Sequence, residues 1–512
     1  MIKNIALVAS FLSTCLAYSI HRPEGFDDPQ PNTSCCAMLS AALGSKISYP
    51  SDLTYNDSLT SYWSDRETDV KPKCIVRPNL DQDVSQAVRL LASNKHCKFA
   101  IRGGGHLGWP EAANIQDGIT FDLSSLDSVS VSQDKTITTV GGGAYWNQVY
   151  SYLDTMNLNC AGGRYATVGV GGLTLGGGIS FFSPRVGWVA DTVESFDVVL
   201  GNGQLEEGVS STKYPDLFRA LKGGSNNFGI VTSLKLKTWS GGPFLTGTVE
   251  YDISHTPELS QAFLKTVGTK KENWDPYAAF LQQYYFVKDP STNGTTSTRI
   301  DNILAYTQPF PKDDSTPNFL KPLQNAAPSK RIDLGVQHLS EFLTKFQDKD
   351  STKPRQVLSN LSFRQDESNF MEKLISLFES TTKLLFRKMS HMYLVLVFQP
   401  IHPVFTSRGN NSLGFDPEEE VPLVNLCIQT SWAGAEFDDL VVSTIREAIE
   451  KANELAKEYG VDSDWLYLNY SEEWQDPIPG YGEEVEILRM VSREYDPEGV
   501  FQRQVPGGFK LW

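Results

Sequence analysis

Two glycine-rich segments constrain the fold more strongly than any other feature of the sequence. Residues 101–106 read Ile-Arg-Gly-Gly-Gly-His, and residues 169–178 read Gly-Val-Gly-Gly-Leu-Thr-Leu-Gly-Gly-Gly. Glycine permits positive φ angles and lets backbone amides come close to a ligand. Successive amides in such turns form concave sites that bind anions such as a pyrophosphate. One segment of this kind can be only a tight turn at the end of a sheet, but two of them favour a nucleotide site.

Neither segment has the form of a common nucleotide-binding motif. No Gly-Lys-Ser/Thr follows either of them, which excludes a P-loop. The dense glycine triplets also lack the spacing of the Rossmann dinucleotide fingerprint. The formal net charge of −16 argues against binding to a nucleic-acid backbone, because that role requires a basic face. We therefore expect a small-molecule nucleotide site of another type and no nucleic-acid partner.

His106 ends the first glycine segment and has three conceivable roles. A histidine at the edge of a nucleotide loop can be a hydrogen-bonded structural residue, a general base or a point of covalent attachment. The residues around it do not decide among these three roles.

The rest of the chain predicts an α+β protein of two domains, because 512 residues exceed the size of one ordinary core. Short strands, helices and glycine-rich turns alternate up to residue 240, and longer strands separated by long polar helices follow. We expect strands at 98–102, 119–123, 193–200, 229–236, 279–286, 300–306, 392–399 and 423–432. We expect helices around 36–43 and at 83–92, 144–155, 370–385 and 437–459.

The N-terminus has the pattern of a cleaved signal peptide, and the protein is expected to be secreted. Lys3 precedes a short apolar stretch, and residues 15–17 form a small-residue cleavage site. The alternatives are a buried first helix or a membrane anchor, but the stretch is too short to span a bilayer. No membrane partner is expected. Sequons for N-glycosylation agree with secretion and start at Asn32, Asn56, Asn293, Asn360, Asn410 and Asn469.

The cysteines that remain after cleavage predict disulfide bonds rather than a metal site. They are Cys35, Cys36, Cys74, Cys97, Cys160 and Cys427. We expect the first four to form two disulfides that tie the N-terminal segment to the first domain. The pairing stays open, since four cysteines allow three connectivities. The spacings contain no C-x-x-C and no accompanying histidine pair, so no zinc site is expected.

Four separated motifs resemble, in order and spacing, the vanillyl-alcohol-oxidase/berberine-bridge-enzyme family of FAD-linked oxidoreductases. They are Arg-Gly-Gly-Gly-His at 102–106, Ala-Thr-Val-Gly-Val-Gly-Gly at 166–172, Leu-Lys-Gly-Gly-Ser-Asn-Asn-Phe-Gly-Ile-Val at 221–231, and a C-terminal signature at 467–470 and 495–501. The resemblance covers nearly everything from Pro72 to the end and looks most like fungal members of secondary metabolism.

The resemblance implies a division of the chain into five parts. A signal peptide (1–17) and a lead-in (18–68) precede a PCMH-type FAD-binding domain (69–240). A substrate-binding domain (241–460), with an antiparallel sheet covered by helices, follows. The last segment (461–512) is expected to return to the FAD-binding domain.

In this family the histidine at the position of His106 is bonded covalently to the 8α-methyl group of the flavin. Many members add a second bond through a cysteine, but Tyr165 stands at that position, and Cys160 lies five residues too early. The resemblance therefore implies FAD held by a single bond, through His106. The implied contacts to the pyrophosphate and the ring are Arg102, Gly103, Gly104, Gly105, His106, Val168, Gly169, Gly171 and Gly172. The implied contacts on the adenosine side are Asp191, Asn227, Gly229, Ile230 and Val231.

The catalytic candidates are four polar residues, Tyr467, Tyr470, Gln399 and Gln429. Tyr467 and Tyr470 are expected near the flavin on an apparent strand, with Asn469 facing the isoalloxazine ring, which would leave the sequon at Asn469 unused. Gln399 and Gln429 interrupt apolar strands and are specificity candidates if they face inward, the alternative being an outward-facing glutamine. Val168 stands where relatives have an oxygen gate, which implies O2 as the electron acceptor.

The expected function is oxidation of a small organic molecule by hydride transfer to covalently bound FAD. A dehydrogenase with another acceptor and an oligosaccharide oxidase are alternatives within the same fold. Two non-redox alternatives are a flavoprotein that guides cyclisation of a reactive intermediate and a secreted binding protein with structural flavin.

Overall fold

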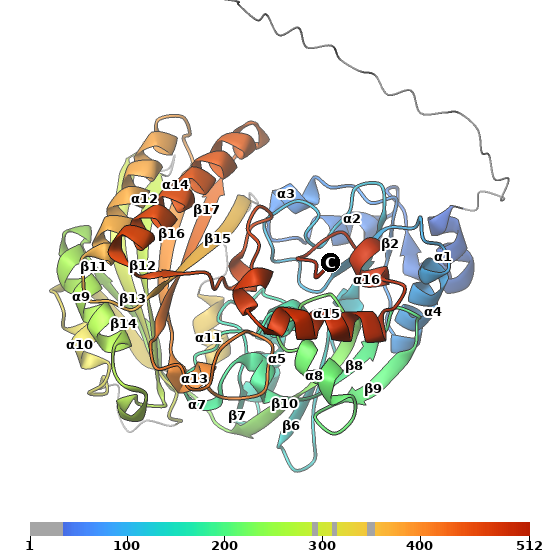
Figure 1. The fold of residues 1–512 in the computed structure, drawn as a ribbon, viewed down its shortest axis with the longest axis horizontal. Helices are drawn as coiled ribbons and strands as arrows, with labels where there is room; N and C mark the ends of the chain where they lie inside the picture. The colour runs from blue at the N-terminus through green and yellow to red at the C-terminus, as the bar shows by residue number, and fades with distance from the viewer. Residues whose placement is uncertain (1–33, 289–294, 310–314, 346–353) are drawn as a thin grey trace, which may run out of the picture. The chain divides into compact units, whose positions relative to one another are not determined.

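The strands pair into three sheets in the computed structural model, which describes residues 34–288, 295–309, 315–345 and 354–512 (Figure 1). The predicted signal peptide and the sequons at Asn32 and Asn293 lie outside these residues. Within them, no helix combines the length and apolar character needed to cross a membrane.

The first sheet carries the first glycine segment. Its strand order is β1-β2-β4-β3, with β2, β3 and β4 parallel. The strands are β1 (Ile47–Ser48), β2 (Cys74–Val76), β3 (Phe99–Arg102) and β4 (Ile119–Asp122). Helices α1 (Cys35–Leu43) and α4 (Asp81–Ala92) contribute buried apolar side chains to the same core cluster. The glycines at 103–105 follow the carboxyl end of β3, where parallel sheets commonly bind ligands.

The second sheet carries the other glycine segment. Its order is β5-β6-β10-β8-β9, and β7 also pairs with β10. The strands are β5 (Val129–Val131), β6 (Ile137–Gly141), β7 (Leu158–Cys160), β8 (Val193–Val199), β9 (Leu205–Val209) and β10 (Ile230–Ser240). The associated helices are α5 (Trp146–Asp154), α6 (Val170–Leu175), α7 (Ser183–Val186) and α8 (Pro215–Ala220). The short helix α6 is formed by the second glycine segment itself.

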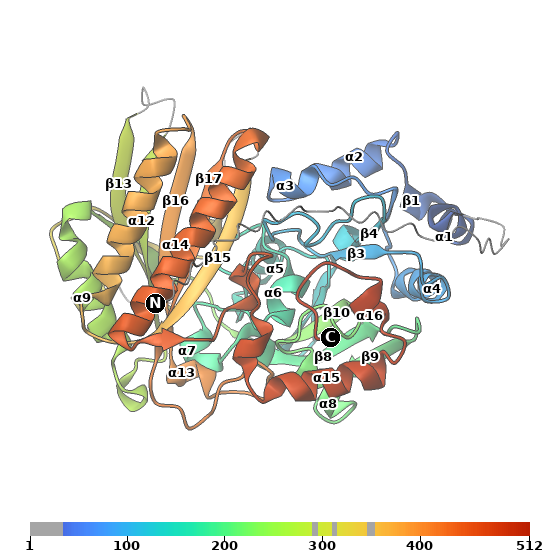
Figure 2. The ribbon, with the colours of Figure 1, turned by 45° about the horizontal axis from the view of Figure 1, so that its top comes forward.

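The third sheet is antiparallel, as expected, and long helices cover one of its faces (Figure 2). Its order is β14-β11-β13-β12-β16-β17-β15-β18. The strands are β11 (Phe244–Tyr251), β12 (Ala278–Lys288), β13 (Thr296–Tyr306), β14 (Ser329–Gln337), β15 (Arg355–Arg364), β16 (Met392–Ile401), β17 (Leu423–Trp432) and β18 (Asp462–Ser463). The covering helices are α9 (Thr256–Val267), α12 (Phe370–Phe386) and α14 (Asp438–Tyr459).

The last helices of the chain lie against the first two sheets. Helix α15 (Glu484–Tyr495) packs beside α8 (Figure 1). The ring of Phe501 in α16 (Val500–Arg503) lies 6.4 Å from that of Phe99 in β3. The side chain of Gln504 donates to the carbonyl groups of Leu91 and Cys97, each at 2.9 Å. The predicted domain boundaries stay a prediction, since residues 35–512 form one unit by their contacts.

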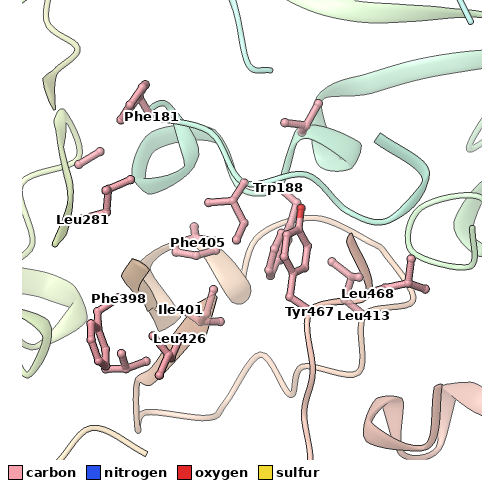
Figure 3. Close-up of a cluster of buried hydrophobic side chains, with 14 of the residues drawn as sticks. Phe181, Trp188, Leu281, Phe398, Ile401, Phe405, Leu413, Leu426, Tyr467 and Leu468 are labelled. Carbon is pink, nitrogen blue, oxygen red and sulfur yellow. The ribbon is translucent and has the colours of Figure 1, made fainter. Parts of the chain in front are cut away.

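A buried aromatic cluster joins the glycine-rich region, the third sheet and the C-terminal segment (Figure 3). Trp188 is fully buried, and its ring lies 5.3 Å from Phe405 and 6.0 Å from Tyr467. Tyr467 thereby packs against residues that lie more than 200 positions away in the sequence, and the core fixes its place beside the glycine segments.

The two predicted disulfides are present. Cys35 bonds to Cys97 and Cys36 to Cys74, so that α1 is tied to β2 and to the loop before β3. Cys160 and Cys427 are free thiols, both buried.

All the predicted strands and helices named above occur near their expected positions, except the strand at 467–470. Four strands of the large sheet escaped prediction: β11, β14, β15 and the two-residue β18. In β15 the residues Gln356, Ser359 and Asn360 are completely buried, which hides the apolar alternation that marks a strand. Strand β14 lies at the edge of the sheet and is largely exposed, so its sequence is mostly polar.

Candidate active site

A cavity of about 550 Å³ lies between the two glycine segments and the third sheet. One side, here called the glycine wall, consists of residues 103–106, 168, 169, 171 and 172. The other side, here called the sheet wall, consists of side chains from five neighbouring strands: Leu281, Gln283, Tyr285, Val287, Arg299, Ile303, Leu358, Tyr393, Val395, Val397, Cys427 and Gln429. On β12, β16 and β17 these positions alternate, because successive side chains of a strand point to opposite faces. The cavity therefore occupies the face of the sheet opposite to the covering helices.

In the glycine wall, the backbones of the two glycine segments touch each other directly. A Cβ atom on Gly104 would lie 2.4 Å from the amide nitrogen of Gly169, so no larger residue fits there. Gly105 has a φ of +62°, which favours glycine. A Cβ atom on Gly172, in contrast, would meet no atom within 4 Å, because this residue faces the open cavity. The wall can therefore admit the phosphates of a nucleotide close to its backbone amides.

His106 lies at the edge of the glycine wall between two aromatic rings. Trp63 stacks on its imidazole at 4.3 Å with an interplanar angle of 13°, and Tyr165 meets it edge-on at 5.3 Å. Among the described residues, the buried Nε2 atom of His106 has no hydrogen-bond partner. Burial lowers the pKa of His106 to about 3, so the ring is uncharged at neutral pH. A ring with so low a pKa is a weak base, so the role of general base is disfavoured.

Three predicted cofactor contacts do not line the cavity. Arg102 is buried behind the glycine loop, where its guanidinium donates to the carbonyl oxygen of Ser58 at 2.5 Å and to Ser61 Oγ at 2.6 Å. It also lies over the ring of Tyr62, at 4.0 Å from the centroid. Arg102 thus anchors the loop to the end of α2 (Leu53–Leu59) and to the turn after it, and the sequence motif alone could not distinguish this support from ligand contact.

Asp191 and Asn227 are the other two predicted cofactor contacts that do not line the cavity. Asp191 accepts hydrogen bonds from the backbone of Trp188 and from Asn411, each at 2.9 Å, and burial raises its pKa to about 6. The side chain of Asn227 donates to the carbonyl groups of Gly224 and Phe509, each at 2.9 Å. Both side chains bind the protein itself. The lining at this end comes instead from Ser225, Asn226, Gly229, Ile230, Val231 and Gly508, three of which were predicted.

Tyr467, Asn469 and Tyr470 all line the cavity, but they do not lie on a strand, and that prediction was wrong. Residues Leu468–Tyr470 form a 3₁₀ turn preceded by Tyr467. Because side chains three residues apart eclipse one another in such a turn, both tyrosines reach the same side. Their rings lie 4.8 Å apart at an angle of 89°. Asn469 donates to the carbonyl oxygen of Leu173 at 3.0 Å and to Tyr467 Oη at 2.9 Å.

Burial raises the pKa of both Tyr467 and Tyr470. For Tyr470 the neighbouring Arg164 opposes this effect without overcoming it. Both hydroxyl groups are therefore protonated at neutral pH, so each can donate a hydrogen bond while its oxygen accepts one from Asn469 or from Arg164.

The two predicted glutamines are placed differently. Gln429 lines the cavity, and its amide nitrogen lies 3.4 Å from Tyr393 Oη. Gln399 is completely buried outside the lining, where it donates to Asn425 at 3.0 Å and accepts a hydrogen bond from Arg164. Gln399 thus positions an arginine of the site rather than facing the cavity.

Sequence reasoning missed most of the sheet wall and one further cation. Arg164 directly precedes Tyr165, and its Nη2 atom lies 3.1 Å from Tyr470 Oη. A charged residue between two glycine motifs was the available signal. No comparable signal marked Tyr285, Arg299 or Tyr393, whose inward orientation follows from strand pairing.

The comparisons with known proteins agree with the geometry. A family model described as an FAD binding domain matches residues 72–208. The FAD-dependent monooxygenase sdcF of Emericella nidulans is 35% identical over 493 residues, which cover 93% of this chain and 98% of the relative. The FAD-dependent monooxygenase CTB5 of Cercospora beticola is 32% identical over 530 residues, which cover 100% and 98% of the two chains.

Solved structures share the fold at low sequence identity. The BBE-like 1 protein of Physcomitrella patens superposes with a TM-score of 0.72 at 18% identity, over 91% of this chain and 97% of its own. The xylooligosaccharide oxidase of Myceliophthora thermophila C1 superposes with a TM-score of 0.71 at 20% identity, over 91% and 98% of the two chains. From the motifs, the fold and the sequence relatives, the chain belongs to the vanillyl-alcohol-oxidase/berberine-bridge-enzyme family of FAD-linked oxidoreductases.

Proposed function

We propose that this protein oxidises a small organic molecule of secondary metabolism, with FAD attached by a single bond to His106 and O2 as the electron acceptor. The observation that carries the proposal is His106 itself. Its uncharged ring lines the cavity at the end of a backbone-built wall, with a buried nitrogen that has no partner among the described residues. Leaving a buried polar atom unpaired costs about 1–3 kcal/mol, which indicates that another group completes this site.

The residues of the cavity fit FAD. The glycine wall and the lining at Ser225, Asn226 and Gly229–Val231 would hold the nucleotide, and His106 would hold the flavin covalently. When bound there, the flavin supplies a two-electron acceptor for the substrate. A second covalent bond is not expected, because Tyr165 occupies the position of the second attachment residue and Cys160 is buried in the core.

The side chains that would act on the substrate are hydrogen-bond donors rather than a carboxylate base. Two protonated tyrosine hydroxyl groups line the cavity. The hydroxyl oxygen of Tyr470 lies 3.1 Å from Nη2 of Arg164, and that of Tyr467 lies 2.9 Å from the amide nitrogen of Asn469. They can orient an oxygen atom of the substrate and stabilise negative charge that develops on it. Gln429 and Tyr393 form a second polar point on the sheet wall.

Val168 supports O2 as the acceptor. It lines the cavity beside Gly169, and its branched but short side chain leaves room for a diatomic molecule. The relatives sdcF and CTB5 are named monooxygenases. The second candidate is therefore transfer of one oxygen atom of O2 to the substrate, in which the other atom would leave as water with two electrons from reduced flavin.

The test separates these chemistries. Purified enzyme is reduced anaerobically with one equivalent of dithionite per flavin, so that no dithionite remains to react with O2, and is then mixed with air-saturated buffer. An oxidase reoxidises rapidly and releases one H2O2 per flavin, whereas a dehydrogenase reoxidises slowly. Incorporation of isotope-labelled O2 into a product would favour the monooxygenase. Absence of anaerobic flavin bleaching with every metabolite, phenol and oligosaccharide offered would favour a cyclisation scaffold or a binding protein.

Secretion is part of the proposal. The disulfides Cys35–Cys97 and Cys36–Cys74 suit an oxidising compartment. Asn56 and Asn410 are exposed and can carry glycans, whereas Asn360 is completely buried and Asn469 is engaged inside the site. Mass spectrometry of the native protein should show an N-terminus near Tyr18 and no glycan on Asn360 or Asn469. A retained Met1 would contradict the signal peptide.

A further inference from the structure

The ionisable side chains that line the cavity include cations but no carboxylates among the described residues. Among the described residues that line it there is no aspartate and no glutamate, but there are two arginines, Arg164 and Arg299. Arg299 is neutralised, since its Nε atom lies 3.1 Å from Asp301, and its guanidinium lies over the ring of Tyr285 at 3.8 Å. The chain as a whole carries a net charge of −16, so a positive cavity is a local feature.

Arg164 is the arginine whose charge is not compensated. Its Nη2 atom donates to Gln399 Oε1 and, at 3.1 Å, to Tyr470 Oη, both of which are neutral acceptors. No ion pair within the described ranges involves Arg164. The site therefore holds a cation in place without supplying its counter-ion.

The acceptors of Arg164 are themselves fixed. Gln399 donates to Asn425 at 3.0 Å, and Asn425 donates to Asn360 at 2.9 Å, all three side chains being completely buried. Asn360 in turn accepts a hydrogen bond from the backbone of Tyr467 at 2.9 Å. This chain of hydrogen bonds orients the guanidinium from the protein side and ties it to the turn that carries Tyr470.

A ligand in this cavity meets a fixed cation and mostly apolar or aromatic surface. The surroundings include Tyr285, Tyr393 and Tyr470, together with Val395 and Val397. An anionic oxygen is attracted to a guanidinium strongly where water is partly excluded, whereas an ammonium group is repelled. The aromatic and apolar side chains favour a flat, unsaturated body over a highly hydroxylated one.

We propose that Arg164 determines specificity by binding an anionic oxygen of an aromatic substrate, a carboxylate, enolate or phenolate. This inference rests on the proposed function for its assumption that substrate and flavin share the cavity. It explains the absence of a lining carboxylate, because a substrate oxygen that arrives deprotonated requires no base. It also disfavours amines and neutral oligosaccharides as the substrate class.

The test measures binding rather than turnover. Equilibrium dialysis of the flavin-containing enzyme at pH 8.5 compares 4-nitrobenzoate, 4-nitrophenolate, neutral nitrobenzene and the cation of a nitrobenzyl-trimethylammonium salt. We expect at least one anion to bind about tenfold or more tightly than nitrobenzene, a difference of about 1.4 kcal/mol, and the cation to bind most weakly. The tighter of the two anions identifies whether a carboxylate or a phenolate is the better match.

Three variants test whether the preference for anions depends on Arg164. In Arg164→Gln the preference for the anion over nitrobenzene should disappear while the affinity for nitrobenzene stays the same. Arg164→Lys should retain part of the preference and serves as the readout if Arg164→Gln does not fold. Lys237→Gln removes an exposed cation paired with Glu194 at 3.1 Å, and this remote charge control should leave the preference unchanged.

Two results would overturn the inference. One is a wild-type enzyme without preference for either anion, and the other is a preference that survives Arg164→Gln. If the preference survives but Arg164→Gln weakens sulfite binding to the flavin, the arginine serves the cofactor instead. Failure of the proposed function is seen separately, as flavin that takes part in no reaction with any substrate offered, and the anion preference of the flavin-containing protein can still be measured in that case.

Discussion

The glycine wall and the sheet wall enclose the same cavity but are built by different means. The glycine wall uses backbone atoms of two segments that touch directly, as at Gly104 and Gly169. The sheet wall uses side chains from strands whose pairing spans much of the chain, as between β12 and β16. The first wall suits the part of a ligand that is constant, a nucleotide, and the second suits the part that varies, a substrate. Changes in the two walls should therefore have separable effects, on flavin loading and on ligand selection.

The largest effect is expected for Gly104→Ala in the glycine wall. The new Cβ atom would lie 2.4 Å from the amide nitrogen and 2.6 Å from Cα of Gly169, where only backbone can move. Overpacking of this kind costs roughly 3 kcal/mol or more, so both the melting temperature and the flavin content should fall sharply.

Two other glycines serve as controls for Gly104→Ala. Gly172→Ala should keep the fold but reduce flavin loading, because its methyl group projects into the cavity without meeting protein atoms. Gly335→Ala, on the edge strand β14 with no atom within 4 Å of the new Cβ, should change neither quantity. Differential scanning fluorimetry and flavin absorbance measure both effects. Normal flavin content in Gly172→Ala would show that the nucleotide does not bind against the glycine wall.

An intermediate effect is expected for Val168→Leu. One additional methylene beside the flavin should slow reoxidation by O2 far more than reduction of the flavin. Stopped-flow experiments time the two half-reactions separately. Val395→Leu makes the same addition on the sheet wall and should alter substrate affinity without slowing reoxidation. Equal slowing of both half-reactions in Val168→Leu would indicate a general distortion of the site, and unchanged reoxidation would remove Val168 as the gate.

The smallest effect is expected for Gln429→Leu in the sheet wall. The substitution removes a polar group that faces the cavity but leaves the backbone pairing of β17 intact. We expect unchanged flavin content and a severalfold change in the Kd of bound aromatic ligands, measured by flavin difference spectra. Loss of flavin from this variant would show that the two walls do not act separately.

The contrast between the walls also explains what could be predicted from the sequence. Two backbones can approach each other this closely only where the residues are glycines, so the glycines at 103–105 and within 169–172 could be recognised in the sequence itself. Arg102, Asp191 and Asn227 lie in or beside recognisable motifs, yet each supports the protein from behind the cavity, and the motif cannot show the direction of a side chain.

The sheet wall could not be predicted in the same way. Whether Tyr285 or Tyr284 faces the cavity depends on the register between strands more than 100 residues apart, as for β12 and β16. Strand β15 was missed because buried polar residues interrupt its apolar pattern, and one of them, Asn360, belongs to the network behind Arg164. The turn at 468–470 was mistaken for a strand, since three residues carry no periodicity that distinguishes the two.

The most direct test of the account is the fate of the flavin after acid precipitation. The wild-type protein should give a yellow pellet, and Tyr165→Phe, which keeps the ring beside His106, should do the same. His106→Ala should release all of its flavin into the supernatant, where its absorbance can be measured. Acid-released flavin from the wild type, or a yellow pellet from His106→Ala, would contradict attachment at His106.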